Sequence, residues 1–185
     1  DQSDAPGVER ARNYLWGFGG VQTFYRALLS EAAKKGPRVT YNSKFPGTAD
    51  VVVSTHPVEY AYTKDGYAFL KDLIKKKDLT GEQWVMGPPR GAAPDRASLE
   101  KGVWELYTKD YILTWRQVLQ KSAVKRYENL QDAAKKLSML TSAEAQAPQL
   151  CLMWWSSTNT AIDLPGVQPA FAVVRKVVPP QQQMA

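Results

Sequence analysis

The feature that most restricts the fold of this chain is a long helical periodicity between Arg96 and Lys121. Side chains three or four positions apart form one wide, mostly apolar stripe there: Leu99, Val103, Leu106, Tyr107, Asp110, Tyr111, Thr114, Trp115 and Val118. Trp104 and Ile112 flank the stripe, so we expect this helix to be buried on more than one side.

The same spacing predicts further helices on both sides of this one. It is seen in Val21, Phe24, Tyr25, Leu28, Leu29 and Ala32, and again in Tyr67, Leu70, Leu73 and Ile74. Thr63 suits the N-cap of the second of these helices, and the lysines at 75–77 suit its C-terminus, where the helix dipole is negative. The inward face of a helix over about 128–140 is predicted to consist of Leu130, Ala133, Ala134, Leu137 and Leu140. Pro148 suits the first turn of another helix.

Two short segments near the N-terminus favour strands instead. Val39–Tyr41 and Val51–Val53 are β-branched or aromatic, and turn-forming residues separate them, which predicts a hairpin with a longer loop. The fold class is therefore mainly α, a multi-helix domain with a small two-stranded β element near the N-terminus. We divide the chain into a small α/β segment (1–61), a helical domain (62–164) and the start of a linker or following β domain (165–185). Phe171–Val178 could form a last helical turn or a strand.

Composition limits the chemistry that the chain can perform. Its only histidine is His56, and the neighbours Ser54, Thr55 and Glu59 would have to converge on it to form a catalytic site, which sequence neighbours at a strand end seldom do. One histidine and one cysteine, Cys151, cannot build a usual zinc site. We therefore expect no enzyme, no metal and no cofactor.

The net charge of +6 leaves a binding module as the alternative. A basic surface attracts nucleic acid or an anionic membrane, although such an excess more often only keeps a domain soluble. The alternative requires the basic residues to share a single face: Lys34, Lys35, Lys75, Lys76, Lys77, Arg126, Lys135 and Lys136.

Several motifs, taken in their order and spacing, resemble the IcmF/TssM family of type VI secretion membrane-core proteins. They are Tyr62-Thr63-Lys64-Asp65-Gly66-Tyr67, Trp84-Val85-Met86-Gly87, Leu106-Tyr107 with Asp110-Tyr111 and Trp115, and Ala147-Pro148 with Thr160 after Leu137–Leu140. The resemblance covers 62–140 most clearly, and Met153-Trp154-Trp155 is more aromatic than the family pattern. An IcmF-like protein of a type IV system is the alternative within the same resemblance.

The resemblance implies the periplasmic helical region of an inner-membrane protein whose anchoring helices precede this segment. Such a protein joins an outer-membrane lipoprotein and a second inner-membrane protein in an envelope-spanning complex, as a homo-oligomer. A β-rich domain would follow. The expected role is a protein–protein interaction scaffold for secretion, without catalysis.

The motifs also have a direct physical interpretation, because their large aromatic side chains anchor helix packing and carry polar tips that need partners. Asp110 shares a face with Tyr107 and Tyr111 and must be paired if it is buried. The pair Trp154-Trp155 could be an exposed partner-binding patch, or one ring could point into the core while the other is half-covered. The predicted structural or interface residues are Tyr62, Tyr67, Trp84, Tyr107, Asp110, Tyr111, Trp115, Trp154 and Trp155.

Overall fold

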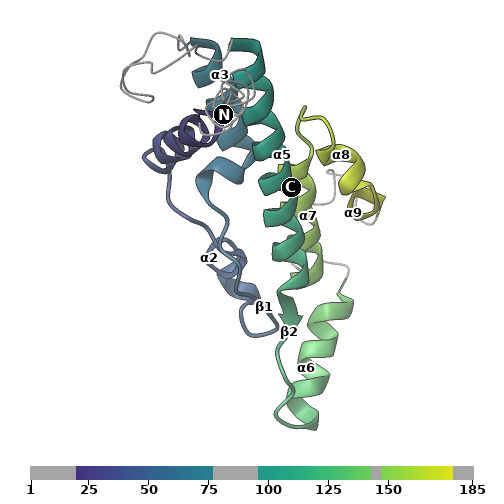
Figure 1. Cartoon of the computed structure of the whole chain (residues 1–185). Coiled ribbons are helices and arrows are strands. Elements are labelled where there is room, and N and C mark those ends of the chain that lie inside the picture. Colours follow the sequence, from purple (N-terminus) through teal and green to yellow (C-terminus); the bar gives the residue numbers. More distant parts are fainter. Residues whose placement is uncertain (1–19, 77–95, 143–146, 177–185) are drawn as a thin grey trace, which may run out of the picture.

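The computed structural model describes residues 20–76, 96–142 and 147–176. These residues form an elongated, mainly helical molecule with a two-stranded sheet, which confirms the predicted fold class (Figure 1). A helix over 20–33 comes first. It is followed by α2 (Tyr41–Lys44), the 3-10 turn η1 (Pro46–Thr48), β1 (Val52–Ser54), the 3-10 turn η2 (Tyr60–Tyr62), α3 (Lys64–Lys76), α5 (Arg96–Gln120), β2 (Ser122–Val124), α6 (Leu130–Thr141), α7 (Pro148–Thr160), α8 (Val167–Ala170) and α9 (Ala172–Lys176).

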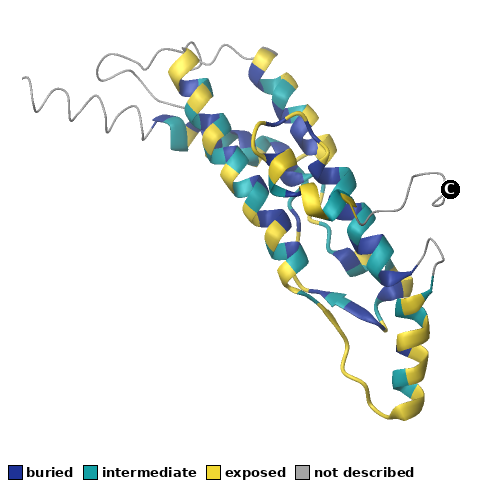
Figure 2. Cartoon of the chain, turned by 90° about the vertical axis from the view of Figure 1, so that its right-hand side faces the viewer, coloured by how far each residue is buried: buried dark blue, intermediate teal, exposed yellow. Residues whose placement is uncertain are grey.

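Helix α5 is the central element and has the predicted length and buried stripe. Six side chains along it are almost completely buried: Leu99, Val103, Tyr107, Tyr111, Trp115 and Val118. Trp104 and Ile112 are half-buried beside them, so the helix is covered on more than one side, as the sequence predicts. Helices α7 and α8 pack on α5, and α3 lies near its N-terminal half (Figures 1 and 2).

The small sheet exists, but its strands come from different segments than the predicted hairpin. β1 pairs antiparallel with β2, about 70 residues further along the chain, with Val52 opposite Val124. Val39 makes a single bridge to Val58, and Tyr41 begins helix α2. The physical reason is a capping box in which the Thr40 hydroxyl accepts the Ser43 N–H. This cap starts a helix at Tyr41, where the sequence pattern predicts a strand.

Helix α3 confirms the predicted cap and the predicted face. The Thr63 hydroxyl accepts the Gly66 N–H at 3.0 Å, while Tyr67, Leu70 and Ile74 are buried. Gly66 allows η2 to approach closely, since a Cβ at this position would lie 1.9 Å from the carbonyl oxygen of Tyr60. The start of α3 and η2 therefore form one tightly packed corner.

Helix α6 contradicts the predicted inward face. It projects as an arm from the end of the molecule that carries the sheet (Figures 1 and 2), with Leu130 91% and Leu137 48% exposed. Its buried side chain is instead Lys136, whose ammonium pairs with Asp132 at 2.6 Å and donates to the Arg126 carbonyl oxygen at 2.8 Å. At the end of α6 next to α7, the half-buried Met139 and Leu140 pack against the core, while the Lys136 contacts join α6 to the preceding loop.

The last described segment is helical, which decides between the two alternatives left by the sequence. Gly166, with φ of +87°, precedes α8, and α9 follows directly, with Val167 and Phe171 buried. The division of the chain into three segments stays a prediction. Across the described ranges, no helix combines the length and the hydrophobicity that a membrane crossing requires.

Candidate functional site

An aromatic cluster lies along α5, and its members are predicted site residues. The rings of Tyr62 and Tyr107 stack at 5.9 Å between centroids, and Tyr107 and Tyr111 lie 5.6 Å apart. One turn further, Trp115 meets Trp155 edge-on at 5.0 Å. Ring pairs at these distances stabilise a core beyond the burial of their area.

The polar tips of these rings bind backbone carbonyls of neighbouring segments. Tyr107 donates to Ala61 at 2.5 Å, and the indole N–H of Trp115 donates to Tyr62 at 2.8 Å. Tyr111 donates to Asn159 at 2.7 Å, close to the end of α7, where helix carbonyls lack helical partners. Burial raises the pKa of both tyrosines well above its ordinary value, so the hydroxyls remain donors at neutral pH. Helix α5 therefore fixes η2 and the end of α7 through hydrogen bonds.

Asp110 is paired, as expected for a carboxylate on the same face of α5 as Tyr107 and Tyr111. Its Oδ2 accepts the Tyr25 hydroxyl at 2.8 Å, and the hydroxyls of Tyr25 and Tyr62 lie 3.1 Å apart. Burial is the main reason that the pKa of Tyr25 is strongly raised, and the hydrogen bond to Tyr62 is the next. The carboxylate thus connects the helix over 20–33 to α5 and has a packing role.

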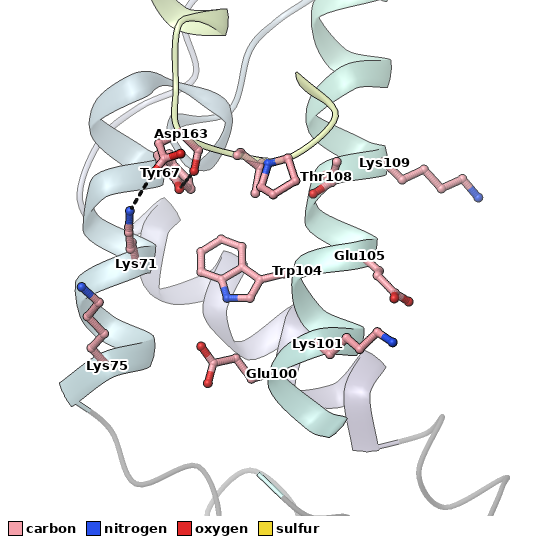
Figure 3. Close-up of a pocket in the computed structure, with 12 residues that line it drawn as sticks. Tyr67, Lys71, Lys75, Glu100, Lys101, Trp104, Glu105, Thr108, Lys109 and Asp163 are labelled. Carbon is pink, nitrogen blue, oxygen red and sulfur yellow. Dashed lines mark hydrogen bonds and ion pairs between the residues drawn. The ribbon is translucent and has the colours of Figure 1, made fainter. Parts of the chain in front are cut away.

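A groove of about 790 Å³ opens between α3, α5 and the loop before α8 (Figure 3). The half-buried ring of Trp104 points into it and meets Tyr67 edge-on at 5.8 Å. The Tyr67 hydroxyl donates to the Asp163 carbonyl oxygen, and the Lys71 ammonium lies 3.5 Å from the Asp163 carboxylate. These contacts hold the loop at 163–165 against α3 and keep one end of the groove in place.

The rim of the groove carries both signs of charge. The charged residues that line it are Lys71, Lys75, Lys101, Lys109, Glu100, Glu105 and Asp163. Its lining residues in the described part of the chain include neither histidine nor cysteine. An apolar floor with a mixed charged rim suits the binding of a protein segment better than acid–base or nucleophilic chemistry.

The structure divides the tryptophan pair between core and surface. Trp155 is 2% exposed and packs against Trp115 and Tyr41, while Trp154 is half-buried and meets Phe45 edge-on at 6.2 Å.

Trp84 lies outside the described residues. Trp104 is absent from the predicted site residues although it is the main aromatic of the groove. Its flanking position beside the stripe of α5 was the available signal.

Two sequence neighbours of the sole histidine, His56, make contacts with other groups. Burial and the nearby charge of Lys121 lower the pKa of His56. The Ser54 hydroxyl lies 3.5 Å from the Val118 carbonyl oxygen, and Glu59 pairs with Arg38 at 2.6 Å, so both neighbours are engaged elsewhere. Within residues 20–76, 96–142 and 147–176, no three His, Cys, Asp or Glu side chains gather closely enough to hold a metal ion.

The basic residues do not share the single face that the alternative requires. Lys35 lies over the ring of Phe69 in α3, so the basic end of the first helix is at the α3 end of the molecule. Arg126, Lys135 and Lys136 belong to the arm at the opposite end (Figure 1). The two groups are separated by the length of α5.

The fold and site define a helical structural module, in which buried aromatic side chains fix backbone segments around an open apolar groove. A family model described as "IcmF-related: Intracellular multiplication and human macrophage-killing" matches residues 2–160. The chain belongs to this IcmF-related family, which confirms the resemblance noted in its motifs and identifies it as a component of an IcmF-type secretion system. No curated protein and no solved structure matches it.

Proposed function

We propose that this chain is a non-catalytic scaffold in the periplasmic part of a type VI secretion membrane complex. The proposal rests on the hydrogen bonds that three buried polar groups of α5 make. The tips of Tyr107, Tyr111 and Trp115 all bind backbone carbonyls within the fold, so these polar groups serve to stabilise the module. Family membership supports a place in a secretion apparatus.

The expected partners are the outer-membrane lipoprotein, the second inner-membrane protein and further copies of the chain. The groove around Trp104 supports contacts of this kind, because an apolar floor with charges of both signs at its rim is the usual make-up of a protein interface. Tryptophan is also enriched among the side chains that dominate interface energies.

The test is capture of the periplasmic proteins encoded beside the gene by the whole chain. Trp104→Ala should reduce capture, because it removes the main apolar side chain of the groove. Leu113→Ala is the matched control, since Leu113 is on the same helix, is 50% exposed and does not line the groove. Trp104→Ala also loses its ring contacts with Tyr67 and Tyr107, so it should unfold at a lower temperature than Leu113→Ala. Capture by the two variants is therefore compared at a temperature at which circular dichroism shows both to be folded. The scaffold proposal fails if the wild-type chain captures no envelope protein and binds DNA or anionic liposomes instead.

A further inference from the structure

The two-stranded sheet has one closed edge and one open edge. Among the described residues, β2 pairs with β1 on one side and has no strand on the other. The chain from Ala123 to Gln131 is exposed throughout, as the largely yellow segment between the sheet and α6 shows (Figure 2). Unpaired edges of this kind are templates for another strand.

The register identifies the backbone groups that face outward. Val52 lies opposite Val124, so Val51 lies opposite Lys125, and the Lys125 N–H donates to the Val51 carbonyl oxygen at 2.8 Å. Hydrogen-bonded and non-bonded pairs alternate along an antiparallel ladder. Ala123 and Lys125 therefore point their backbone groups toward β1, whereas Val124 points its N–H and C=O away from β1.

The outer edge of β1 confirms this alternation and is closed by a side chain. Asn42 donates through Nδ2 to the Val52 carbonyl oxygen at 2.7 Å and accepts the Ser54 N–H through Oδ1 at 3.0 Å. These are the outward-facing groups that the alternation predicts for β1. In the described part of the chain no side chain covers Val124 in the same way, and its own side chain is 45% exposed.

The charge around the open edge selects the partner. No Asp or Glu occurs between Tyr111 and Tyr127, while Arg116, Lys121, Lys125 and Arg126 do. The positive charge of Lys121 contributes to the lowered pKa of His56, which lies just after β1. Like charges directly opposite each other destabilise paired strands and opposite charges stabilise them. A second copy of β2 would bring lysine toward lysine, whereas an acidic strand would meet complementary charge.

The carboxylates near this edge are fewer than the basic groups around them. Asp50, Glu128 and Asp132 line the same hollow as Lys125, Arg126, Lys135 and Lys136. Asp132 is paired with the buried ammonium of Lys136. The surroundings of β2 therefore carry an excess of positive charge, to which Lys121 adds.

We propose that the open edge of β2 accepts an extended, acidic segment of a partner protein as a third strand. This inference rests on the proposed scaffold function and names the surface and the chemistry of one contact. The backbone of Val124 supplies one N–H and one C=O to the incoming strand, and Lys121, Lys125 and Arg126 attract its carboxylates.

The sharpest test removes the outward N–H alone. Val124→Pro deletes that donor, and proline is tolerated on an edge strand where the N–H does not pair within the sheet. Val124→Ala is the matched control, because it shortens the side chain and keeps the N–H. The probe is a fluorescein-labelled peptide, Thr-Glu-Val-Glu-Val-Thr-Glu, followed by fluorescence anisotropy at low and high salt. The same peptide with lysine at each glutamate position controls for charge.

The wild-type chain and Val124→Ala should bind the acidic peptide within about twofold of each other, and Val124→Pro about tenfold more weakly, as the loss of one hydrogen bond implies. Binding should weaken with salt and be absent for the lysine peptide. Equal binding by Val124→Pro, or binding of both peptides alike, would overturn the proposal. So would a concentration-dependent dimer in sedimentation that Val124→Pro abolishes, since the occupant would then be a second copy.

The same variant separates this proposal from the scaffold function. If Val124→Pro captures envelope proteins as the wild-type chain does, the scaffold function stands and the strand-addition site is refuted. If no chain captures any of them, the scaffold function itself fails. The circular dichroism spectrum of each variant should match that of the wild type, because Ala123 and Lys125, and not Val124, face β1 with their backbone groups.

Discussion

Gly66→Ala tests whether the corner between η2 and α3 organises the molecule. The new Cβ would lie 1.9 Å from the carbonyl oxygen of Tyr60 and 2.9 Å from the Cα of Ala61. Both are backbone atoms, so no side-chain rotation can make room. Because distances under 3.0 Å are essentially never seen for a real Cβ, η2 must move away by about 1 Å or more.

The cost follows from what holds η2 in place. A movement of about 1 Å breaks the bond from Tyr107 to Ala61, at 2.5 Å, and the bond from Trp115 to Tyr62, at 2.8 Å. Breaking each of these two buried hydrogen bonds costs about 1–3 kcal/mol. Alanine regains about 1 kcal/mol of helix propensity within α3. The expected net loss of unfolding free energy is therefore about 1–5 kcal/mol, with a central value of about 3 kcal/mol.

Urea unfolding followed by tryptophan fluorescence measures this loss, and two other glycines provide the scale. A Cβ at Gly47 meets nothing within 4 Å, so Gly47→Ala should be neutral or stabilise by up to about 1 kcal/mol. The loss of unfolding free energy in Gly102→Ala should lie between those of the other two variants. Its new Cβ would meet the methyl groups of the Val21 side chain at 2.9 and 3.0 Å, and a side chain can move more easily than backbone. If Gly66→Ala unfolds at the same urea concentration as Gly47→Ala, the tight corner does not exist and the reasoning is refuted.

Three further predictions concern single groups. Tyr111→Phe should lower the unfolding free energy by about 1–3 kcal/mol, measured by thermal unfolding, because the buried Asn159 carbonyl loses its donor. The Cys151 thiol should react with a disulfide reagent at pH 8 only as fast as the chain unfolds, since burial covers it and raises its pKa. The pKa of Asp132 is lowered, mainly by the hydrogen bond to Lys136, so the contact between α6 and the preceding loop should keep its structure above the ordinary carboxyl value of 3.8 and lose it as the pH falls through the lowered pKa. Amide chemical shifts of residues 126–136 against pH measure this loss.

Each of these predictions has a control in the same chain. Tyr127 is 47% exposed, so Tyr127→Phe should leave stability unchanged; an equal loss would show that the hydroxyl bond of Tyr111 is not the cause. Fast modification of Cys151 in native buffer would contradict its burial. Asp132→Asn should remove the pH dependence of the arm, and an unaltered titration in that variant would assign the change to another carboxyl group.

The interior of the fold could be predicted because it depends on periodicity. The stripe from Leu99 to Val118 follows from spacing alone, and Thr63 and Pro148 mark helix starts through local chemistry. The need for partners at the tips of Tyr107 and Trp115 was also predictable. The partners themselves were not, because they are backbone carbonyls, and any residue supplies one.

What the sequence did not predict depends on contacts between distant segments. The leucines of α6 have helical spacing, but spacing does not say whether another element covers them, and here Leu130 and Leu137 remain exposed. Strand β2 is three residues long and gains its identity only by pairing with β1. The groove likewise exists because the loop at 163–165 is held beside α3, and the flanking position of Trp104 on α5 did not say which segments would lie opposite it.

The way the arm is held explains how a stable module can leave apolar residues exposed at one end. Helix α6 is joined to the preceding loop by Lys136, which binds both the Asp132 carboxylate and the Arg126 carbonyl oxygen. Asn129 adds an N-cap, its side chain accepting the Asp132 N–H at 2.8 Å. These polar contacts fix α6 to the preceding loop, and Met139 and Leu140 pack against the core, so the arm does not require Leu130 and Leu137 to be buried. The body, in contrast, is closed by aromatic rings, and the polar tips of Tyr107, Tyr111 and Trp115 bind backbone carbonyls within it. The two surfaces that we propose for partners, the groove and the open edge of β2, therefore lie toward opposite ends of α5.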